Sequence, residues 1–524
     1  MSFVSFEFLL FLLILFVLYY ALPRRFQWML LLVGSLVFYA FASPKYLIYI
    51  AVTAMSTWAA GRAISAEYRG RDSYIKETPD ITKEQKKARK DAAKKKAKTI
   101  MVLCLVLNLG ILAVIKYTDF FISNINSLFG ADIAFMRFAL PMGISFYTFM
   151  SAGYIIDVFR GKYAAEENPA RFALFVSFFP QLIQGPISRF DDLSKSLYEE
   201  HAFDAQSITH GAWRVLWGYF KKMVVADRLA PLVAGIAGSP DKYAGGYVLA
   251  LIFFYSLQIY ADFTGGIDIT IGIAKMFGVK VTENFDRPFF SRNIAEFWRR
   301  WHITMGTWFK DYIFYPVSVS KWMMKVSKWS RTKLGNTVGK RVPVYLSTIL
   351  VWLATGIWHG ASWNFVVWGL LNCVVIMISQ EISPLYDKFH KRFSFSNTKG
   401  WDIFQMFRTF WLMGFLRVLD VYRDVPLTFR MVPTIFSGRG WSEMFSGGLL
   451  KFGLSTADFI VVFAACIVML VVGILQGRGT VCGQLSEKPR AVRWTVIWVL
   501  IVIIITLGAY GIGYDAAQFI YNQF

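Results

Sequence analysis

The sequence predicts an all-α polytopic membrane protein, and three observations support this fold class. Of the 524 residues, 56% are hydrophobic and only 17% are charged, which is far more apolar than an average soluble domain. Residues 3–22 form an apolar run with one acid, long enough for a helix to cross roughly 30 Å of hydrocarbon. Positive charge is concentrated in two blocks beside such runs. Several segments are therefore expected to face lipid.

The first run is expected to be a retained helix. It is too long for the core of a signal peptide, and no small-residue cleavage site follows it. Twelve similar runs follow, at residues 26–42, 45–65, 99–117, 139–159, 171–187, 211–237, 247–272, 342–358, 361–380, 403–420, 457–476 and 493–513. Those between 139 and 187 and at 211–237 are interrupted by Gly, Pro and charge, as in helices that line a cavity or re-enter the membrane. We expect ten to thirteen transmembrane and re-entrant helices.

The net charge of +22 is distributed in a way that indicates topology rather than nucleic-acid binding. Residues 67–98 carry twelve Lys and Arg against six acids, which predicts a cytoplasmic basic loop and places the N-terminus outside. Residues 321–341 carry seven Lys and Arg, no acid and interleaved Trp and Met. This block is expected to be an interfacial helix with its basic side toward anionic lipid headgroups. Docking of a cytosolic acidic partner or of a phosphorylated cofactor is the alternative.

No linker, low-complexity tract or internal repeat divides the chain, so a single membrane domain over residues 1–524 is expected. The four cysteines are scattered and show neither a disulfide framework nor metal-ligand spacing. No metal site is predicted.

Residues 281–316 are aromatic but too rich in charge to cross lipid, so they should lie at the interface or be enclosed by other helices. Read as one helix, this segment has an aromatic stripe formed by Trp298, Trp301, His302, Met305, Trp308, Phe309 and Tyr312. His302 is expected at the edge of the stripe, in a dry setting with one edge of its ring open.

His359 ends an apolar run, where an ionisable side chain is costly and therefore suggests a function. The small residues Gly356, Gly360 and Ala361 surround it and are expected to leave room for a ligand or a second chain. A neutral imidazole in an apolar site is suited to act as a general base. A histidine that only binds a neighbouring helix, or a metal site completed by Asp262 or Asp268, is the alternative.

Three other histidines, His201, His210 and His390, lie in polar or basic stretches and are expected on the surface.

Two further segments are expected to break within the membrane. Asp262 and Asp268 stand in a stretch where Gly265 and Gly266 are expected to interrupt the helix. One of these carboxylates is expected to orient a histidine, to hold an arginine or to form a structural ion pair. Gln184, followed by Gly and Pro, marks a second break, read as a cavity wall or a turn.

The strings FWRRWHITMGTWFKDYIFYP and TGIWHGASWNFVVWG, some forty residues apart, resemble the membrane-bound O-acyltransferase (MBOAT) superfamily. The likeness continues upstream in FFPQLIQGPISRF and DFTGGIDITIGIAKMFG and weakens after about residue 380. Within the superfamily the chain is most similar to bacterial AlgI-type alginate and polysaccharide O-acetyltransferases, also in the stretch GFLRVLDVYRDVPLTF. Gly266, Ile267 and Leu416 depart from that pattern and leave the subfamily and acceptor open.

The resemblance implies an MBOAT-type ring of about 10–13 transmembrane and re-entrant helices around a central tunnel. By that resemblance His359 matches the catalytic histidine and His302 the second one. The basic candidates for binding the CoA phosphates or for lining the cytoplasmic funnel are Lys310, Arg299, Arg300 and Arg287. The expected substrate-binding residues are Trp298, Arg299, Arg300, Trp301, Lys310, Trp358, Asn364, Asp262, Asp268 and Gln184.

The implied reaction takes an acetyl group from acetyl-CoA, a substrate rather than a cofactor, at the cytoplasmic side. The expected acceptor is a hydroxyl of an extracellular polysaccharide or of a secreted SGNH-type partner transferase. No GxSxG nucleophile elbow is present, which favours a separate transferase. The alternatives are DltB-type D-alanyl transfer to teichoic acid, a lipid or polysaccharide transporter, and a catalytically silent scaffold.

Overall fold

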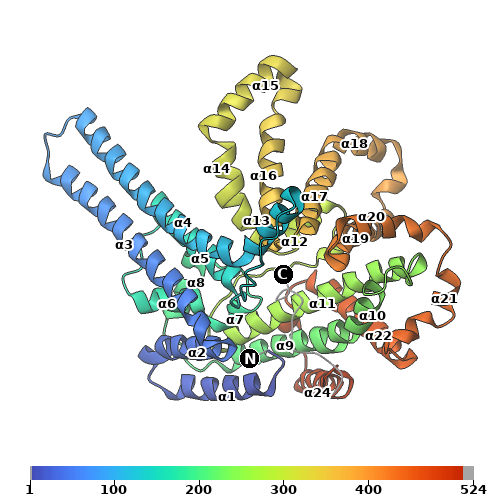
Figure 1. Cartoon of the computed structure of the whole chain (residues 1–524). Helices are drawn as coiled ribbons and strands as arrows, with labels where there is room; N and C mark the ends of the chain where they lie inside the picture. Colours follow the sequence, from blue (N-terminus) through green and yellow to red (C-terminus); the bar gives the residue numbers. More distant parts are fainter. Residues whose placement is uncertain (1–2, 511–524) are drawn as a thin grey trace. The chain divides into compact units, whose positions relative to one another are not determined.

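The computed structural model describes residues 3–510, and most of them are helical (Figure 1). Over this range no strand forms, and Phe285 and Trp301 make an isolated antiparallel bridge. The all-α prediction is therefore confirmed. Six short 3₁₀ segments lie at residues 24–26, 44–46, 288–290, 394–397, 432–436 and 448–452.

Contacts divide the chain into two compact units, each described by itself below. The described part of the first unit comprises residues 3–211 and 273–282, and that of the second comprises residues 212–272 and 283–510.

The first unit contains a long helical hairpin made by α3 (Leu47–Glu77) and α4 (Lys83–Phe129), which lie side by side in Figure 1. The segment expected as a basic loop is helical except at residues 78–82, because Lys, Arg, Glu and Ala are strong helix formers. Thr82 caps α4 through a reciprocal capping box with Gln85. The other helices of this unit are α1 (Phe6–Ala21), α2 (Gln27–Ala42), α5 (Ile144–Arg160), α6 (Pro169–Ser177), α7 (Phe179–Leu182) and α8 (Phe190–Tyr198).

Helix α9 (Ala205–Tyr219) begins in the first unit and continues in the second as a π-helical turn, Phe220–Ala226, and as α10 (Asp227–Ala237). It packs closely on α11 (Gly246–Met276), because Gly218 and Gly265 meet without side chains between them. A Cβ added to Gly265 would lie 2.9 Å from the carbonyl oxygen of Gly218. The expected break at Gly265 and Gly266 is wrong: α11 is continuous there, and its glycines serve helix packing.

The second unit is completed by the helices that follow α11. They are α12 (Ile294–Arg300), α13 (Ile303–Phe309), the π-helical turn Lys310–Phe314, α14 (Tyr315–Ser318), α15 (Lys321–Gly339), α16 (Val342–His359), α17 (Trp363–Glu381), α18 (Ser383–Arg392), α19 (Lys399–Tyr422), α20 (Val425–Met431), α21 (Trp441–Phe445), α22 (Thr456–Gln476), α23 (Val481–Ser486) and α24 (Arg490–Leu507). Helix α17 packs on α16, α12 and α19, and so connects the segments that carry the two histidines to α19.

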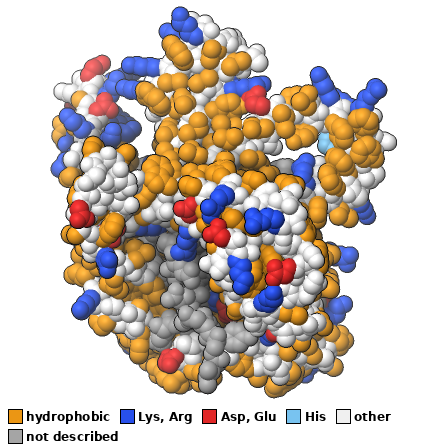
Figure 2. All heavy atoms as spheres, turned by 45° about the vertical axis from the view of Figure 1, so that its right-hand side comes forward, with side chains coloured by type: hydrophobic (Ala, Val, Ile, Leu, Met, Phe, Trp, Pro, Cys, Tyr) orange, Lys and Arg blue, Asp and Glu red, His pale blue; other side chains and the backbone are white. Residues whose placement is uncertain are grey.

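Eight helical stretches within residues 3–510 are long and apolar enough to cross a membrane. They are residues 24–42, 44–77, 83–129, 246–276, 342–359, 363–381, 456–476 and 490–507. Helix α1 is apolar but has 16 residues, and the runs expected at 139–159, 171–187 and 211–237 form shorter or interrupted helices. Figure 2 shows hydrophobic side chains over much of the visible surface. The surface is that of a multi-pass membrane protein.

Candidate active site

His302 lies at a break between two short helices. The backbone of residues 284–286 pairs with residues 300–303: Asp286 N donates to Arg300 O across 3.0 Å, and Ile303 N donates to Asn284 O across 2.9 Å. This pairing removes residues 301 and 302 from the helix, so the single helix expected through Trp301 is wrong. His302 takes a left-handed conformation with φ +49°, which is uncommon for a residue with a side chain and is often found at functional sites.

The His302 ring is fully buried, and not open at one edge as the sequence predicted. Its Nδ1 lies 3.2 Å from Oδ1 of Asn284, which also accepts from the backbone N–H of Thr304 at 3.0 Å. A backbone N–H can only donate, so the Asn284 atom in this position is the oxygen. Nδ1 of His302 must therefore carry the proton, and Nε2 has the lone pair.

Burial lowers the pKa of His302 to about 3, because the imidazolium is poorly solvated there. The neutral ring makes edge-on contacts with Phe263 at 5.0 Å and with Trp358 at 5.9 Å between centroids. His302 is thus a neutral hydrogen-bond acceptor near neutral pH. Asn284, whose side chain fixes this tautomer, was not predicted as a site residue.

His359 is the last residue of α16, and its ring contacts Trp358 at 5.1 Å and Trp368 at 4.7 Å. Trp358 thus lies beside both histidines. The glycines around His359 make room for α17 and not for a ligand: a Cβ on Gly356 would lie 2.5 Å from Phe365 O, and one on Gly360 would lie 2.2 Å from the Phe365 ring. The negative end of the α16 dipole faces this position and stabilises positive charge on the imidazole.

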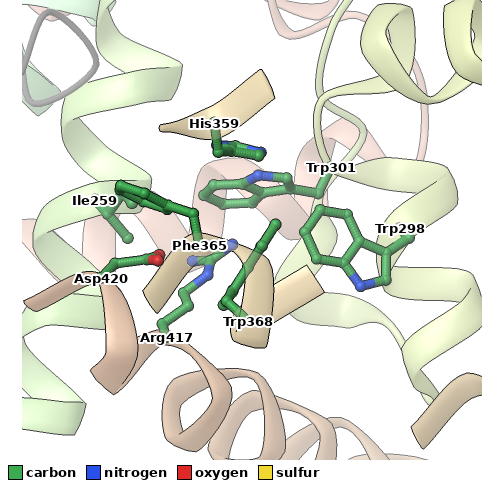
Figure 3. Close-up of a pocket in the computed structure, with 8 residues that line it drawn as sticks. All are labelled: Ile259, Trp298, Trp301, His359, Phe365, Trp368, Arg417 and Asp420. Atoms are coloured by element: carbon green, nitrogen blue, oxygen red, sulfur yellow. The ribbon is translucent and has the colours of Figure 1, made fainter. Parts of the chain in front are cut away.

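A narrow pocket of about 20 Å³ lies beside His359, with room for roughly one water molecule. Five helices (α11, α12, α16, α17 and α19) and the break at Trp301 line it (Figure 3). The lining residues are Ile259, Trp298, Trp301, His359, Phe365, Trp368, Arg417 and Asp420. The structure thus brings the predicted residues Trp298, Trp301 and His359 together. An acyl group of more than one or two heavy atoms requires side-chain movement to enter.

Arg417 and Asp420, from α19, are the charged members of this pocket. Arg417 is 2% exposed, and its guanidinium carbon lies 3.8 Å from the centroid of the Trp301 ring. In Figure 3 the guanidinium lies between Phe365 and Trp368, and the Asp420 carboxylate points toward it. Neither residue was predicted as a site residue. The available signal was two opposite charges three residues apart in the apolar second half of α19.

Asp262 and Asp268, predicted to bind substrate, are held by ion pairs that join α11 to α9 and to the π-helical turn Phe220–Ala226. Asp262 lies 2.7 Å from Lys222 Nζ, and both side chains are 1% exposed. Asp268 lies 2.5 Å from Lys221 and 2.9 Å from Arg214. Both carboxylates therefore form structural ion pairs, which is one of the alternatives that the sequence left open.

The basic residues considered for the acyl donor lie away from the pocket lining. Arg299 and Lys310 are exposed, Arg300 pairs with Glu296 at 2.8 Å, and Arg287 pairs with its neighbour Asp286 at 3.1 Å. Their role in binding stays a prediction.

Two other predicted residues are buried. Asn364 is 1% exposed, and its Nδ2 donates to Leu419 O across 3.1 Å, which ties α17 to α19. Gln184 belongs to the first unit and is fully buried in the irregular segment that follows α7, so the helix break expected there is confirmed.

Comparisons with known proteins identify relatives over most of the chain. The model of the MBOAT, membrane-bound O-acyltransferase family, matches residues 166–419, a stretch that contains both histidines. A probable alginate O-acetylase AlgI from Azotobacter vinelandii is 32% identical over 470 residues, covering 88% of this chain and 82% of the relative. A peptidoglycan O-acetyltransferase from Helicobacter pylori is 32% identical over 55% of this chain and 57% of the relative.

A teichoic acid D-alanyltransferase from Bacillus subtilis is also similar, at 26% identity over 50% of this chain and 63% of the relative. These relatives are named for the transfer of different acyl groups. The family model and the apolar helices were found in this chain itself. The chain belongs to the membrane-bound O-acyltransferase family and is a multi-pass membrane acyltransferase.

Proposed function

We propose that this acyltransferase passes an acetyl group from cytoplasmic acetyl-CoA to a hydroxyl of an extracellular polysaccharide, or of a secreted partner transferase that modifies it. The relatives named for alginate and peptidoglycan O-acetylation support an acetyl group and a polysaccharide target. The N-terminus lies outside in this proposal, with the basic hairpin of α3 and α4 on the cytoplasmic side.

The observation that carries the proposal is His359, which ends α16 in a pocket walled by tryptophans. In the proposed reaction the acceptor oxygen attacks the thioester carbonyl carbon, and His359 takes the hydroxyl proton. The carbon–sulfur bond then breaks, and the CoA thiolate leaves and takes that proton from His359. The product is an acetyl ester and free CoA thiol.

His302 has a different role in this proposal. Because its Nδ1 donates to Asn284, its Nε2 can only accept a hydrogen bond while the ring is neutral. It is therefore suited to hold an acceptor hydroxyl and is not suited to donate to the thioester carbonyl.

The test is acetylation of surface polysaccharide in cells that express His359→Ala or wild-type protein. Esters are released by alkali and identified by mass spectrometry, and protein amount is measured in the membrane fraction. The expected loss is on the order of 10² to 10⁴ in rate, the size of a general-base contribution. The control is His390→Ala on α18, outside the pocket. Near wild-type acetylation by a well-expressed His359→Ala protein would overturn the mechanism.

The same experiment addresses D-alanyl transfer, which the similarity to a teichoic acid D-alanyltransferase supports. Release of D-alanine instead of acetate, lost in His359→Ala, would assign that donor group and keep the role of His359.

A further inference from the structure

The reaction proposed above needs a group that stabilises negative charge on the thioester carbonyl oxygen, and His302 cannot supply it. In acyl transfer this oxygen becomes an oxyanion, and preorganised hydrogen-bond donors aimed at it are usually the largest single contribution to catalysis. Hydrogen-bond donors beside His359 are therefore the candidates for this role.

Two residues that carry N–H donors, Trp368 and Arg417, line the same pocket as His359. Trp368 is 3% exposed, and its buried indole Nε1 has no hydrogen-bond acceptor among the described residues. Its ring centroid lies 4.7 Å from that of His359. A buried polar atom without a protein partner is uncommon and calls for an explanation, such as a ligand that it meets during function.

The second donor is the Arg417 guanidinium, which cannot be deprotonated and presents its N–H groups in a rigid fork. Stacking on Trp301 at 3.8 Å holds its plane, and the centroid of the Phe297 ring lies 5.3 Å from the guanidinium carbon. Asp420 lies three residues further along α19 and lines the same pocket.

We propose that Trp368 Nε1–H and the Arg417 guanidinium form the oxyanion site of this enzyme, with Asp420 as the positioning residue for Arg417. The proposal rests on the acyl-transfer function proposed above. When the acceptor oxygen bonds to the carbonyl carbon, the carbonyl electron pair moves to oxygen, and these two donors stabilise it. When the carbon–sulfur bond breaks, the carbonyl re-forms and the CoA thiolate leaves.

The test uses the full-length protein in lipid nanodiscs with acetyl-CoA as the probe, and measures release of the CoA thiol in the presence of the extracted surface polysaccharide. Trp368→Phe removes the N–H and keeps most of the ring, and Arg417→Gln removes the charge. Each is expected to lower kcat by about 10² to 10³ with little change in KM for acetyl-CoA, as for loss of one oxyanion donor. Arg417→Lys, which keeps the charge, is expected to retain more activity than Arg417→Gln.

Trp411→Phe and Arg408→Gln are matched controls on α19, because neither residue lines the pocket. Both should keep wild-type kcat. For Asp420, kcat should fall in Asp420→Asn and recover in Asp420→Glu, a rescue that a merely structural effect on folding would not give. Elution as a single peak in size-exclusion chromatography establishes that each variant is folded.

Wild-type kcat in a folded Trp368→Phe or Arg417→Gln protein would overturn the role of that residue, and with it the proposed two-donor site. A raised KM at unchanged kcat would also overturn it, because it would indicate ground-state binding. Failure of the proposed function is distinguishable: the wild-type protein would then release no more thiol than His359→Ala.

Discussion

Oδ1 of Asn284 lies 3.2 Å from Nδ1 of His302, and this hydrogen bond determines which nitrogen of the imidazole carries the proton. The same oxygen accepts from the backbone N–H and the hydroxyl of Thr304, at 3.0 and 2.9 Å. One side chain thus supports the left-handed turn, the start of α13 and the histidine tautomer.

Asn284→Leu is expected to destabilise the protein and to lower acyl transfer. Removal of Oδ1 takes away the acceptor that the Thr304 N–H and the His302 Nδ1–H share, at a cost of roughly 1–3 kcal/mol for each group. The melting midpoint in detergent should fall, and activity per folded protein should fall with it, because the ring can then adopt the other tautomer. Asn397→Leu, at an exposed position, is the control. Equal midpoints for the two variants would contradict the supporting role.

The pH dependence of stability should report the burial of His302. Its pKa is about 3 in the folded protein and near the ordinary 6.5 when unfolded, so only the unfolded chain binds this proton between those values. The contribution of His302 to the free energy of unfolding is fully present above pH 6.5 and is lost as the pH falls toward 3. At pH 5 the loss is about 2 kcal/mol.

Melting midpoints at pH 7.5 and 5.0 measure this contribution. His302→Asn lacks the titrating group and tolerates the left-handed backbone, so its midpoint should fall less on acidification than that of the wild type. Parallel falls in both proteins would show that His302 does not titrate on unfolding.

The ion pairs of Asp268 on α11 predict that two substitutions lower the free energy of unfolding by different amounts. In Asp268→Leu, buried Lys221 keeps its contacts with the Thr264 hydroxyl at 2.8 Å and with the face of Trp217, but it loses its carboxylate partner. This loss should lower the free energy of unfolding by about 3–5 kcal/mol. Lys221→Met should cost less, because Asp268 keeps Arg214 at 2.9 Å. Chemical or thermal unfolding of the two purified variants compares them, and the reverse order would refute this account.

The membrane segments could be predicted from sequence because hydrophobic length is a local property. The predicted run at 342–358 forms a helix at 342–359, and the run at 457–476 forms one at 456–476. The predicted run at 493–513 overlaps α24 up to residue 507, and its residues 511–513 lie outside the described range. The single-domain organisation stays a prediction.

The site was only partly predictable because its geometry depends on contacts between distant segments. The periodicity around His302 indicated one helix, but pairing with residues 284–286 breaks it, and no local pattern reports that pairing. The glycines beside His359 indicated open space, but α17 fills it. Arg417 is 58 residues from His359 in the chain, and only the packing of α19 on α17 brings it to the same pocket.

Gly356 on α16 packs directly against the backbone of α17 at Phe365. A Cβ at this position would lie 2.5 Å from Phe365 O and 3.2 Å from the Phe365 carbonyl carbon, which are backbone atoms and cannot move like the end of a flexible side chain. Gly356→Ala should therefore separate α16 from α17, at a cost of about 1–3 kcal/mol for overpacking. Because His359 is three residues further along α16, acyl transfer should fall as well.

Gly110→Ala on α4 is the matched control, since a Cβ there meets nothing within 4 Å. It should be neutral or stabilising by up to about 1 kcal/mol, because alanine is the better helix former. The two variants differ from the wild type by the same methyl group, so opposite shifts in melting midpoint isolate the α16–α17 contact. A Gly356→Ala protein as stable and active as Gly110→Ala would show that His359 does not depend on this close approach.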